Sequence, residues 1–448
     1  MIKLFLVSIL FLLLSCEDSF LEIKRESTQV IPKDFDDLQA LMDAPLMYTG
    51  MSTELGTIGS DEYYVPDGLL NTLTVPFQRN GYIWANDIYE GQEVADWDNA
   101  YRRILCTNIV LEGLEKLSSN ENEHANIKGI ALFHRAYNLY LLQQQFGADY
   151  SDRKVQPQLG VPIRTESDVT IISQRATIEM VYSMIIEDLT LAVKLLPEKP
   201  VVKYRPGKQA AFCVLSKVHL QMGEYDKALE YANKALNFSH ELIDYNLIDR
   251  NSLFPFSSNP EENKEIIFYS SMTPSTILLT RYSVDTLFYG LYDQHDLRKD
   301  IYFNINKDKR ILFKGSYQGY GNGANFVGLA VDEILLIKME CLVREKRFIE
   351  ARPILRNFLK MRHHGNFSVD IPDDELLSSI ILERRKELFF RGTRWADLRR
   401  LNKESHFAVD LVRIVDGKRH ILKPNTSRYL WPIPNNVVEL SDVFQNPR

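Results

Sequence analysis

The segment 380–401, IILERRKELFFRGTRWADLRRL, constrains the fold most, because it is the densest mixture of charged and large apolar side chains in the sequence. Side chains three and four positions apart share one face of a helix, and such a series runs through Ile381, Arg384, Glu387, Leu388 and Arg391. Gly392 interrupts the series, and a second helical turn restarts through Trp395 and Leu398. The segment therefore predicts two helical pieces joined at a glycine.

Two interpretations fit these charges. An acid, several guanidinium groups and an indole could bind an anion or a sugar. Alternatively, the charges pair locally, since Glu387 can reach Arg391 and Arg394 can reach Asp397 along a helix. Arginine suits such partly buried pairs because its fork is rigid and its stem is apolar. Buried charges need partners, so we favour a salt-bridged helix–turn–helix packed against the fold.

The first residues are typical of a targeting segment. Met1 to Lys3 form a short positive region, and Leu4 to Leu14 form an apolar stretch too short to span a bilayer. Ser15-Cys16 follows, and this arrangement resembles the bacterial lipobox. It predicts a lipoprotein signal peptide at 1–15, lipid attachment at Cys16 and a polar tether over 16–33. The alternative is an ordinary secretory signal with a chance cysteine.

Composition excludes several functions. The net charge of −7 provides no basic field for nucleic acid, and 45% hydrophobic with 25% charged residues indicates a folded body. The remaining cysteines, widely spaced and odd in number, predict free thiols rather than a disulfide framework; they are Cys106, Cys213 and Cys341. His363 and His364 are adjacent, which is not a ligand spacing, so we expect no metal and no cofactor.

Helices dominate the periodicity. We expect helices over 34–42, 97–117, 125–146 and 177–196. Residues 208–238 fit the tetratricopeptide repeat, with Gly223 at the turn and small residues at Ala228 and Ala235. Residues 334–361 repeat the design loosely, with Lys346 where the turn glycine would be. The fold class predicted is mostly α: about four helix pairs, with loop-rich insertions and a few short strands, one of them at 266–270.

Two loop regions hold unusually many aromatic residues. Long loops are uncommon unless functional, and exposed aromatic faces take the CH side of a sugar ring. The Gly-rich segment 314–325 lacks the Lys-Ser/Thr ending of a phosphate-binding loop, so a surface loop presenting tyrosine is expected there. The candidate ligand-binding residues are Tyr63, Tyr64, Tyr82, Trp84, Tyr317 and Tyr320.

The motifs together resemble the SusD/RagB family of Bacteroidetes outer-membrane lipoproteins. The resemblance rests on the pattern ExRRxELxFxGxRWxDLxR from Glu383, together with Cys16, the GVPI at Gly160, the WPIP at Trp431 and the final QNP. It implies a tetratricopeptide-like scaffold anchored at the cell surface, divided into an N-terminal region 34–250 and a C-terminal region 251–448. It also implies binding of a nutrient oligomer and its delivery to a SusC-like, TonB-dependent transporter.

Three functions remain open after the resemblance. The first is binding of a nutrient oligomer: we favour a glycan, and a RagB-like peptide ligand is the alternative. The second is a repeat scaffold lipoprotein with no small ligand. The third is a hydrolase, for which carboxylate pairs exist at Asp61-Glu62, at 373–375 and at Glu383 with Glu387. Adjacent acids point in different directions and no nucleophile motif accompanies them, so we expect no enzyme.

Overall fold

The computed structural model describes residues 32–117, 121–155, 157, 159–365 and 367–448. The predicted signal peptide, Cys16 and nearly all of the tether lie outside the described residues, so these predictions stay untested. Within the described part of the chain, every helix is too short or too polar to cross a bilayer.

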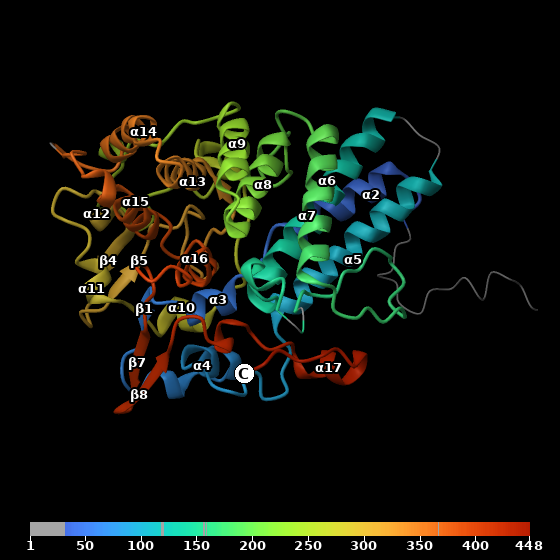
Figure 1. The fold of residues 1–448 in the computed structure, drawn as a ribbon, viewed down its shortest axis with the longest axis horizontal. Helices are drawn as coiled ribbons and strands as arrows, with labels where there is room; N and C mark the ends of the chain where they lie inside the picture. The colour runs from blue at the N-terminus through green and yellow to red at the C-terminus, as the bar shows by residue number, and fades with distance from the viewer. Residues whose placement is uncertain (1–31, 118–120, 156, 158, 366) are drawn as a thin grey trace, which may run out of the picture.

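Long helices stack side by side across the upper half of the molecule in Figure 1. They pack in the order α5, α6, α7, α8, α9 and α13, with α2 on α5 and α6. Their bounds are α2 Phe35–Asp43, α5 Ala95–Lys116, α6 Glu121–Phe146, α7 Ile178–Leu195, α8 Lys208–Met222, α9 Tyr225–Leu236, α13 Val331–Arg344, α14 Phe348–Lys360 and α15 Asp373–Glu387. Each helix buries an apolar stripe against its neighbours, so the stack confirms the mostly α scaffold.

The α8–α9 pair has the expected tetratricopeptide geometry. Gly223 ends α8 in the left-handed conformation (φ 75°), and the Ser216 hydroxyl donates to the Ala228 carbonyl at 2.9 Å because small residues let the helices approach closely. Lys346 takes the same left-handed conformation (φ 60°) between α13 and α14. The helix expected over 177–196 is α7, which packs between α6 and α8.

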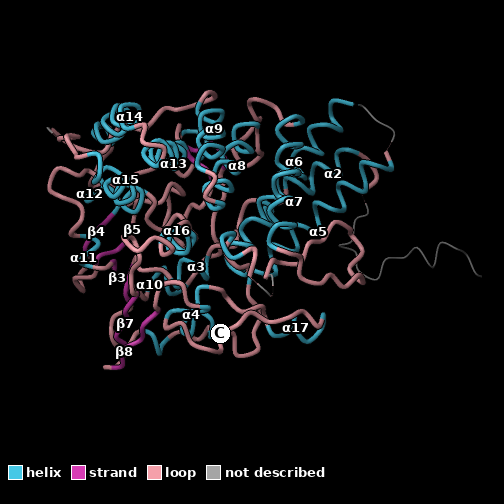
Figure 2. The backbone as a smooth tube through the Cα atoms, viewed as in Figure 1, coloured by secondary structure: helices cyan, strands magenta, loops and turns pink. Residues whose placement is uncertain are grey.

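Most of the short helices and strands lie in the lower half of the view, where Figure 2 shows mostly loop. The helices are α3 Glu54–Gly59, α4 Pro76–Tyr82, α10 Thr276–Thr280, α11 Thr286–Tyr289, α12 Arg298–Tyr302, α16 Arg394–Leu401 and α17 Asn435–Ser441. The strands are β1 Tyr63–Tyr64, β2 Ile266–Phe268, β3 Ser283–Val284, β4 Phe303–Ile305, β5 Ile311–Phe313, β6 Leu329–Ala330, β7 Leu411–Val415 and β8 Lys418–Leu422. They form antiparallel pairs β1–β3, β2–β6, β4–β5 and β7–β8.

The segment 380–401 is buried and salt-bridged, but its partners are not the predicted local ones. Glu387 accepts from Arg298 Nη1 at 2.9 Å and from Arg362 Nε at 2.8 Å, and not from Arg391. The chain turns after α15, with Phe390 (φ 54°) and Gly392 (φ 69°) in the left-handed conformation, so residues 387 and 391 do not share a helix. The prediction that this segment is buried and salt-bridged is therefore confirmed, whereas the predicted pair between Glu387 and Arg391 is wrong.

The second predicted pair is also replaced. Arg394 binds both oxygens of Asp61, at 2.6 and 2.8 Å, and Asp397 pairs with Arg384 and Arg400 instead. The C-terminal tail closes over this region, where the Trp431 ring stacks on Trp395 with 5.1 Å between centroids. Helices from both predicted regions meet in this core, because α13 packs on α8 and α9. The division at residue 250 stays a prediction.

The three described cysteines are free thiols. Cys213 and Cys341 are buried, and Cys106 is half-buried. Burial raises the pKa of all three thiols, which keeps them protonated and unreactive at neutral pH.

Candidate functional site

A cleft of about 730 Å³ lies at the lower left of Figure 1, between β1, α11 and the β7–β8 hairpin. Pockets of a few hundred to a thousand Å³ are the usual size for small-ligand sites. Its lining includes four of the six aromatic candidates, Tyr63, Tyr64, Tyr82 and Trp84. The structure thus brings the early aromatic loop together with a hairpin more than three hundred residues away in the sequence.

Two short elements form one wall of the cleft. β1 pairs with β3 in the register Tyr63↔Val284 and Tyr64↔Ser283, so successive side chains of β1 point to opposite faces. Tyr63 is buried, whereas the Tyr64 side chain is 39% exposed. Asp285 caps α11 by accepting from Phe288 N at 2.9 Å, and this places Leu287, 83% exposed, at the rim.

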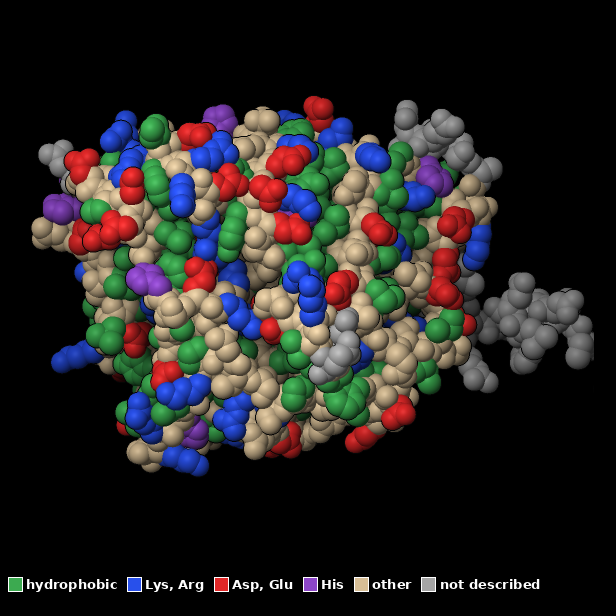
Figure 3. Space-filling model, viewed as in Figure 1, with side chains coloured by type: hydrophobic (Ala, Val, Ile, Leu, Met, Phe, Trp, Pro, Cys, Tyr) green, Lys and Arg blue, Asp and Glu red, His purple; other side chains and the backbone are tan. Residues whose placement is uncertain are grey.

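The opposite wall is the β7–β8 hairpin. Its turn is Asp416-Gly417, with φ of 47° and 75°, which is the type I′ geometry that matches strand twist. Along β7, Leu411 and Arg413 are buried while Val412 and Ile414 are exposed. Lys and Arg side chains gather at the lower left of Figure 3, over the outside of this hairpin. The exposed residues of β8 include Lys418 and Arg419.

Arg413 attaches the hairpin to the body. Its guanidinium donates to the carbonyls of Ile58, Ser60 and Tyr82. The carbon of the guanidinium lies 3.8 Å from the Tyr82 ring centre, 4.5 Å from Trp84 and 5.6 Å from Tyr63. Such cation–π contacts are strong when desolvated, and Arg413 is buried. Three of the candidate aromatics therefore surround an arginine.

This packing corrects the expectation of exposed sugar platforms at those three positions. Tyr63, Tyr82 and Trp84 are buried, and their polar atoms are used internally: Tyr63 donates to Ile58 O at 3.0 Å and Trp84 to Gly59 O at 3.0 Å. The Tyr82 hydroxyl accepts from Val65 N at 2.8 Å. Burial raises the pKa of both tyrosines. Of this group, Tyr64 alone presents its ring to solvent.

In the Gly-rich loop, too, one candidate tyrosine is buried and the other is exposed. Tyr317 is buried and donates to Glu265 Oε2 at 2.7 Å, so its expected presentation on a surface loop is wrong. Tyr320 is 44% exposed and is the second candidate whose ring is accessible. The burial of these six residues does not show whether any of them contacts a ligand. Their roles in binding stay predictions.

The carboxylates beside the cleft serve structure. Burial disfavours the charged form of Asp61, but Arg394 and Arg385 outweigh it and hold the pKa of Asp61 below its usual range. Burial raises the pKa of Glu62 to about 7, partly offset because Glu62 accepts from Phe390 N. Glu383 and Glu387 both bind Arg298. These four carboxylates are thus engaged with arginines or with a backbone N–H of the fold.

Three buried carboxylates, Glu265, Asp332 and Glu387, lie close enough to suggest a cation site. Guanidinium groups already surround them: Arg362 binds Glu265 and Glu387, and Arg391 binds Asp332. The cluster is part of the ionic network of the core, and the residues do not fit a metal ion.

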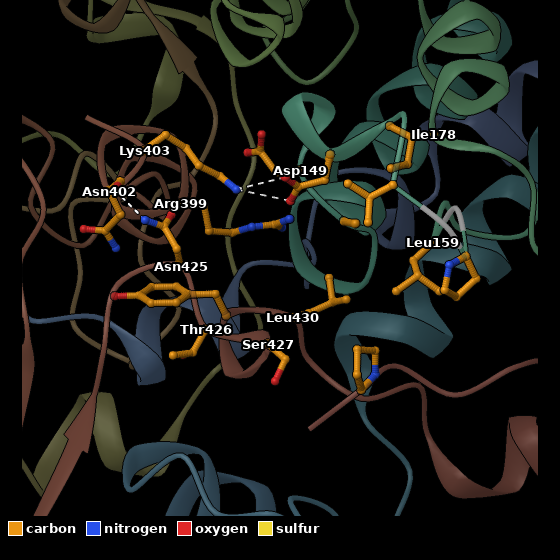
Figure 4. Close-up of a pocket in the computed structure, with 16 residues that line it drawn as sticks. Asp149, Leu159, Ile178, Arg399, Asn402, Lys403, Asn425, Thr426, Ser427 and Leu430 are labelled. Carbon is orange, nitrogen blue, oxygen red and sulfur yellow. Dashed lines mark hydrogen bonds and ion pairs between the residues drawn. The ribbon is translucent and has the colours of Figure 1, made fainter. Parts of the chain in front are cut away.

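A smaller hollow of about 240 Å³ lies where α16 meets the end of α6 (Figure 4). Arg399 donates there to the Gln144 and Gly147 carbonyls at the end of α6, which it caps. Lys403 is paired with Asp152 at 3.1 Å. The charged groups of this hollow are engaged with the fold, so the larger cleft is the stronger candidate site.

Sequence reasoning missed the hairpin half of the cleft. The segment LVRIV-DG-KRHIL carries the signal, because an Asp-Gly pair between two short β-branched stretches predicts a two-residue hairpin. That pattern does not predict the burial of Arg413, because the aromatic rings that surround its guanidinium lie far away in the sequence.

Comparison with known proteins finds similarity to SusD-like proteins. The model of the SusD-like family described as "Starch-binding associating with outer membrane" matches residues 19–220. SusD-like protein P2 of Formosa agariphila is 25% identical over 382 residues, covering 72% of this chain and 74% of that protein. A putative sugar binding protein from Bacteroides vulgatus has the same fold, with a TM-score of 0.77 at 22% identity over 94% of this chain and 99% of that one. The chain is thus similar to SusD-like proteins in sequence over its N-terminal part and shares their fold over nearly its whole length.

A second SusD-like structure also has this fold over nearly the whole chain. A laminarin-binding SusD-like protein superposes with a TM-score of 0.69 at 17% identity, covering 93% of this chain and all (100%) of that one. At this low sequence identity, the superposition shows that the two proteins share the fold. The family resemblance expected from the segment 380–401 and the terminal motifs is thereby confirmed.

Proposed function

We propose that this SusD-like protein binds an oligosaccharide at the cell surface and delivers it to a SusC-like, TonB-dependent transporter in the outer membrane. The observation that carries the proposal is the cleft of about 730 Å³ with the Tyr64 ring exposed at its rim. Similarity to a family described as starch-binding, and a fold shared with a laminarin-binding protein, support a carbohydrate ligand. The protein acts by binding rather than by catalysis.

The sugar contact is assigned to Tyr64, with Tyr320 as a second platform. A tyrosine face packs against the CH side of a sugar ring, and the hydroxyl can bond to sugar hydroxyls. Both rings are accessible without rearrangement of the core, unlike those of Tyr63, Tyr82, Trp84 and Tyr317. Aliphatic side chains at the rim, including Leu287 and Ile414, would bury the remaining apolar face of the sugar.

Titration calorimetry with laminarin and with starch-derived oligosaccharides tests the site. We expect Tyr64→Ala to weaken binding at least tenfold while the melting temperature stays unchanged, because the ring packs in no core. Phe238→Ala is the matched control, since Phe238 on the α8–α9 pair is equally exposed at 39%. Unchanged affinity of the Tyr64 variant for every glycan that binds would refute the assignment.

We also propose that Cys16 carries the lipid anchor. The residue follows an apolar segment of signal-peptide length. Mass spectrometry of the membrane-extracted protein should show a mature N-terminus at Cys16 with attached acyl chains. Cys16→Ser should release the protein from the membrane fraction; a full-length, unacylated N-terminus in the membrane fraction would contradict the anchor.

A further inference from the structure

A small cavity lies in the core, where the segment 380–401 meets α6, α8, α13 and the loop before α3. Its volume is about 30 Å³. This is room for about two water molecules or one monatomic ion, and it is too small for a sugar ring or a peptide. The cavity shares no lining residue with the cleft of about 730 Å³, so the two are separate sites.

Buried hydrogen-bond donors without a partner belong to the residues around this cavity. Ser52, Thr53, Arg384 and Arg391 line it, and each is more than nine-tenths buried. Within the described residues, no acceptor meets the two hydroxyls, Arg384 Nη1, or Nε and Nη2 of Arg391. Buried donors are normally paired, because the loss of their bonds to water is otherwise not compensated.

Ion pairs hold the two guanidinium groups in place. Arg384 donates through Nε to Asp397 at 2.8 Å and through Nη2 to Glu333 at 3.3 Å. Arg391 donates through Nη1 to Asp332 at 2.9 Å. The nitrogens left on Arg391, Nε and Nη2, carry the parallel N–H groups of a bidentate fork. The free donors are therefore fixed before any ligand binds.

The charge of the lining is positive. It contains three cations, Lys217, Arg384 and Arg391, and one carboxylate, Glu333, which binds Lys217 at 2.8 Å and Arg384 at 3.3 Å. Burial disfavours the charged form of Glu333, yet these two cations outweigh it and lower its pKa. Cations and carboxylates balance in number over all these ion pairs, but the two aspartates do not line the cavity. An anion is therefore favoured inside it, and a cation is not.

The donor set favours an anion over water. Six unpartnered buried atoms belong to the lining: five can donate a hydrogen bond, and only Gln145 Oε1 is solely an acceptor. An anion accepts from every N–H and O–H that points at it, whereas a water molecule must also donate two hydrogens of its own. Hydrogen bonds from a guanidinium to an anion are also among the stronger ones in proteins.

We propose that this cavity binds one halide ion, physiologically chloride, through Ser52, Thr53, Arg384 and Arg391. The ion joins the loop before α3 to α15 and to the turn that follows α15, which lie far apart in the sequence. Its role is to stabilise the packing of the segment 380–401. The site lies in the core and does not depend on the carbohydrate function proposed for the cleft.

Bromide provides a probe for the position of the ion, because it replaces chloride and scatters X-rays anomalously. We expect crystals of the protein soaked in sodium bromide to show an anomalous peak in the cavity, within hydrogen-bond reach of the Arg391 fork and the Ser52 hydroxyl. A cavity that holds only water under these conditions would overturn the proposal.

Thermal unfolding tests the binding in solution. Chloride in place of gluconate, at constant ionic strength, should raise the melting temperature of the wild type by about 2 °C, since an ion that binds only the folded state stabilises it. Ser52→Ala combined with Thr53→Val removes two donors, so most of this increment should disappear. In gluconate the double variant should melt no lower than wild type, because the hydroxyls that it loses have no other partner in the described residues.

Ser270→Ala is the matched control. Ser270 is also fully buried with an unpartnered hydroxyl, but it does not line the cavity, so this variant should keep the whole increment. An equal increment in the double variant and the wild type, or its loss in the control, would show that chloride acts elsewhere and would refute the site. If the double variant does not fold, Ser52→Ala alone is held to the same criterion.

Discussion

The guanidinium of Arg413 lies 3.8 Å from the centre of the Tyr82 ring and donates to the Tyr82 carbonyl. One side chain thereby joins the C-terminal hairpin to the early aromatic loop and decides which aromatic faces stay free. The cleft, with Tyr64 on one wall and the edge of β7 on the other, exists because of this contact.

Arg413→Ala should detach the hairpin. The change leaves the Ser60 and Tyr82 carbonyls without the donor that they have in the described residues, and it removes the cation from three rings. We therefore expect a loss of about 2–4 kcal/mol in the free energy of unfolding. Chemical denaturation measures it. Arg419→Ala, exposed on β8, should leave the unfolding curve unchanged. Equal stability of the two variants would show that Arg413 does not hold the hairpin.

Glu387→Ala should be far more damaging than its size suggests. Glu387 lies between Arg298 and Arg362, all three fully buried. Its removal leaves two buried guanidinium groups short of a counter-charge, which typically costs about 3–5 kcal/mol. Loss of soluble, folded protein or a large fall in melting temperature is expected. Glu350→Ala, which breaks the exposed pair with Arg347, is the control and should melt like wild type.

Stability should fall as the pH rises from 5 to 8. Burial, and then the nearby Asp96, raises the pKa of Glu54 to about 8, and burial raises the pKa of Asp96 to about 7. The folded protein therefore holds protons that the unfolded chain releases above its ordinary carboxyl pKa. This contribution is complete below the ordinary pKa values, 4.5 for Glu54 and 3.8 for Asp96, and it disappears as the pH passes the folded pKa values of about 8 and about 7.

Glu54→Gln tests the origin of that slope. A neutral amide keeps the contact with Gln78 and removes the charge, so the variant should be more stable than wild type at pH 8 and show a flatter pH dependence. Glu241→Gln, on the surface, should reproduce the wild-type slope. A Glu54→Gln slope as steep as wild type would place the titration elsewhere.

Comparing Gly392→Ala with Gly223→Ala separates the cost of backbone strain from the cost of a steric clash at the new Cβ. Both glycines have positive φ, 69° and 75°, where an alanine costs about 1–2 kcal/mol. A Cβ at Gly392 would also lie 2.8 Å from Thr53 Cβ, whereas nothing lies within 4 Å at Gly223. We expect Gly392→Ala to lower the melting temperature further than Gly223→Ala. The opposite order would mean that the turn after α15 can relax.

Local patterns predicted much of the scaffold. The stripes of α5, α6, α7 and α8, the turn at Gly223 and its counterpart at Lys346 depend on residues a few positions apart. The burial of 380–401 also follows from local sequence. Large aromatic side chains favour burial, and the charged side chains between them must then form ion pairs inside the fold. For the site, the clustering of aromatic residues in loops predicted residues that line one wall of the cleft. It did not distinguish the buried Tyr63 from the exposed Tyr64. Period-two alternation separates them only once the strand and its buried face are known.

The sequence by itself determined the helices, the helix-pair design, the family pattern and the need for a salt-bridged interior, because these follow from periodicity, turn residues and charge density over short stretches. The tertiary structure alone decided which charges pair and which rings are free. Arg298 meets Glu387 across 89 residues, Arg394 meets Asp61 across 333, and Arg413 meets Tyr82 across 331. Such partners are chosen by the way distant elements pack, which no local pattern contains.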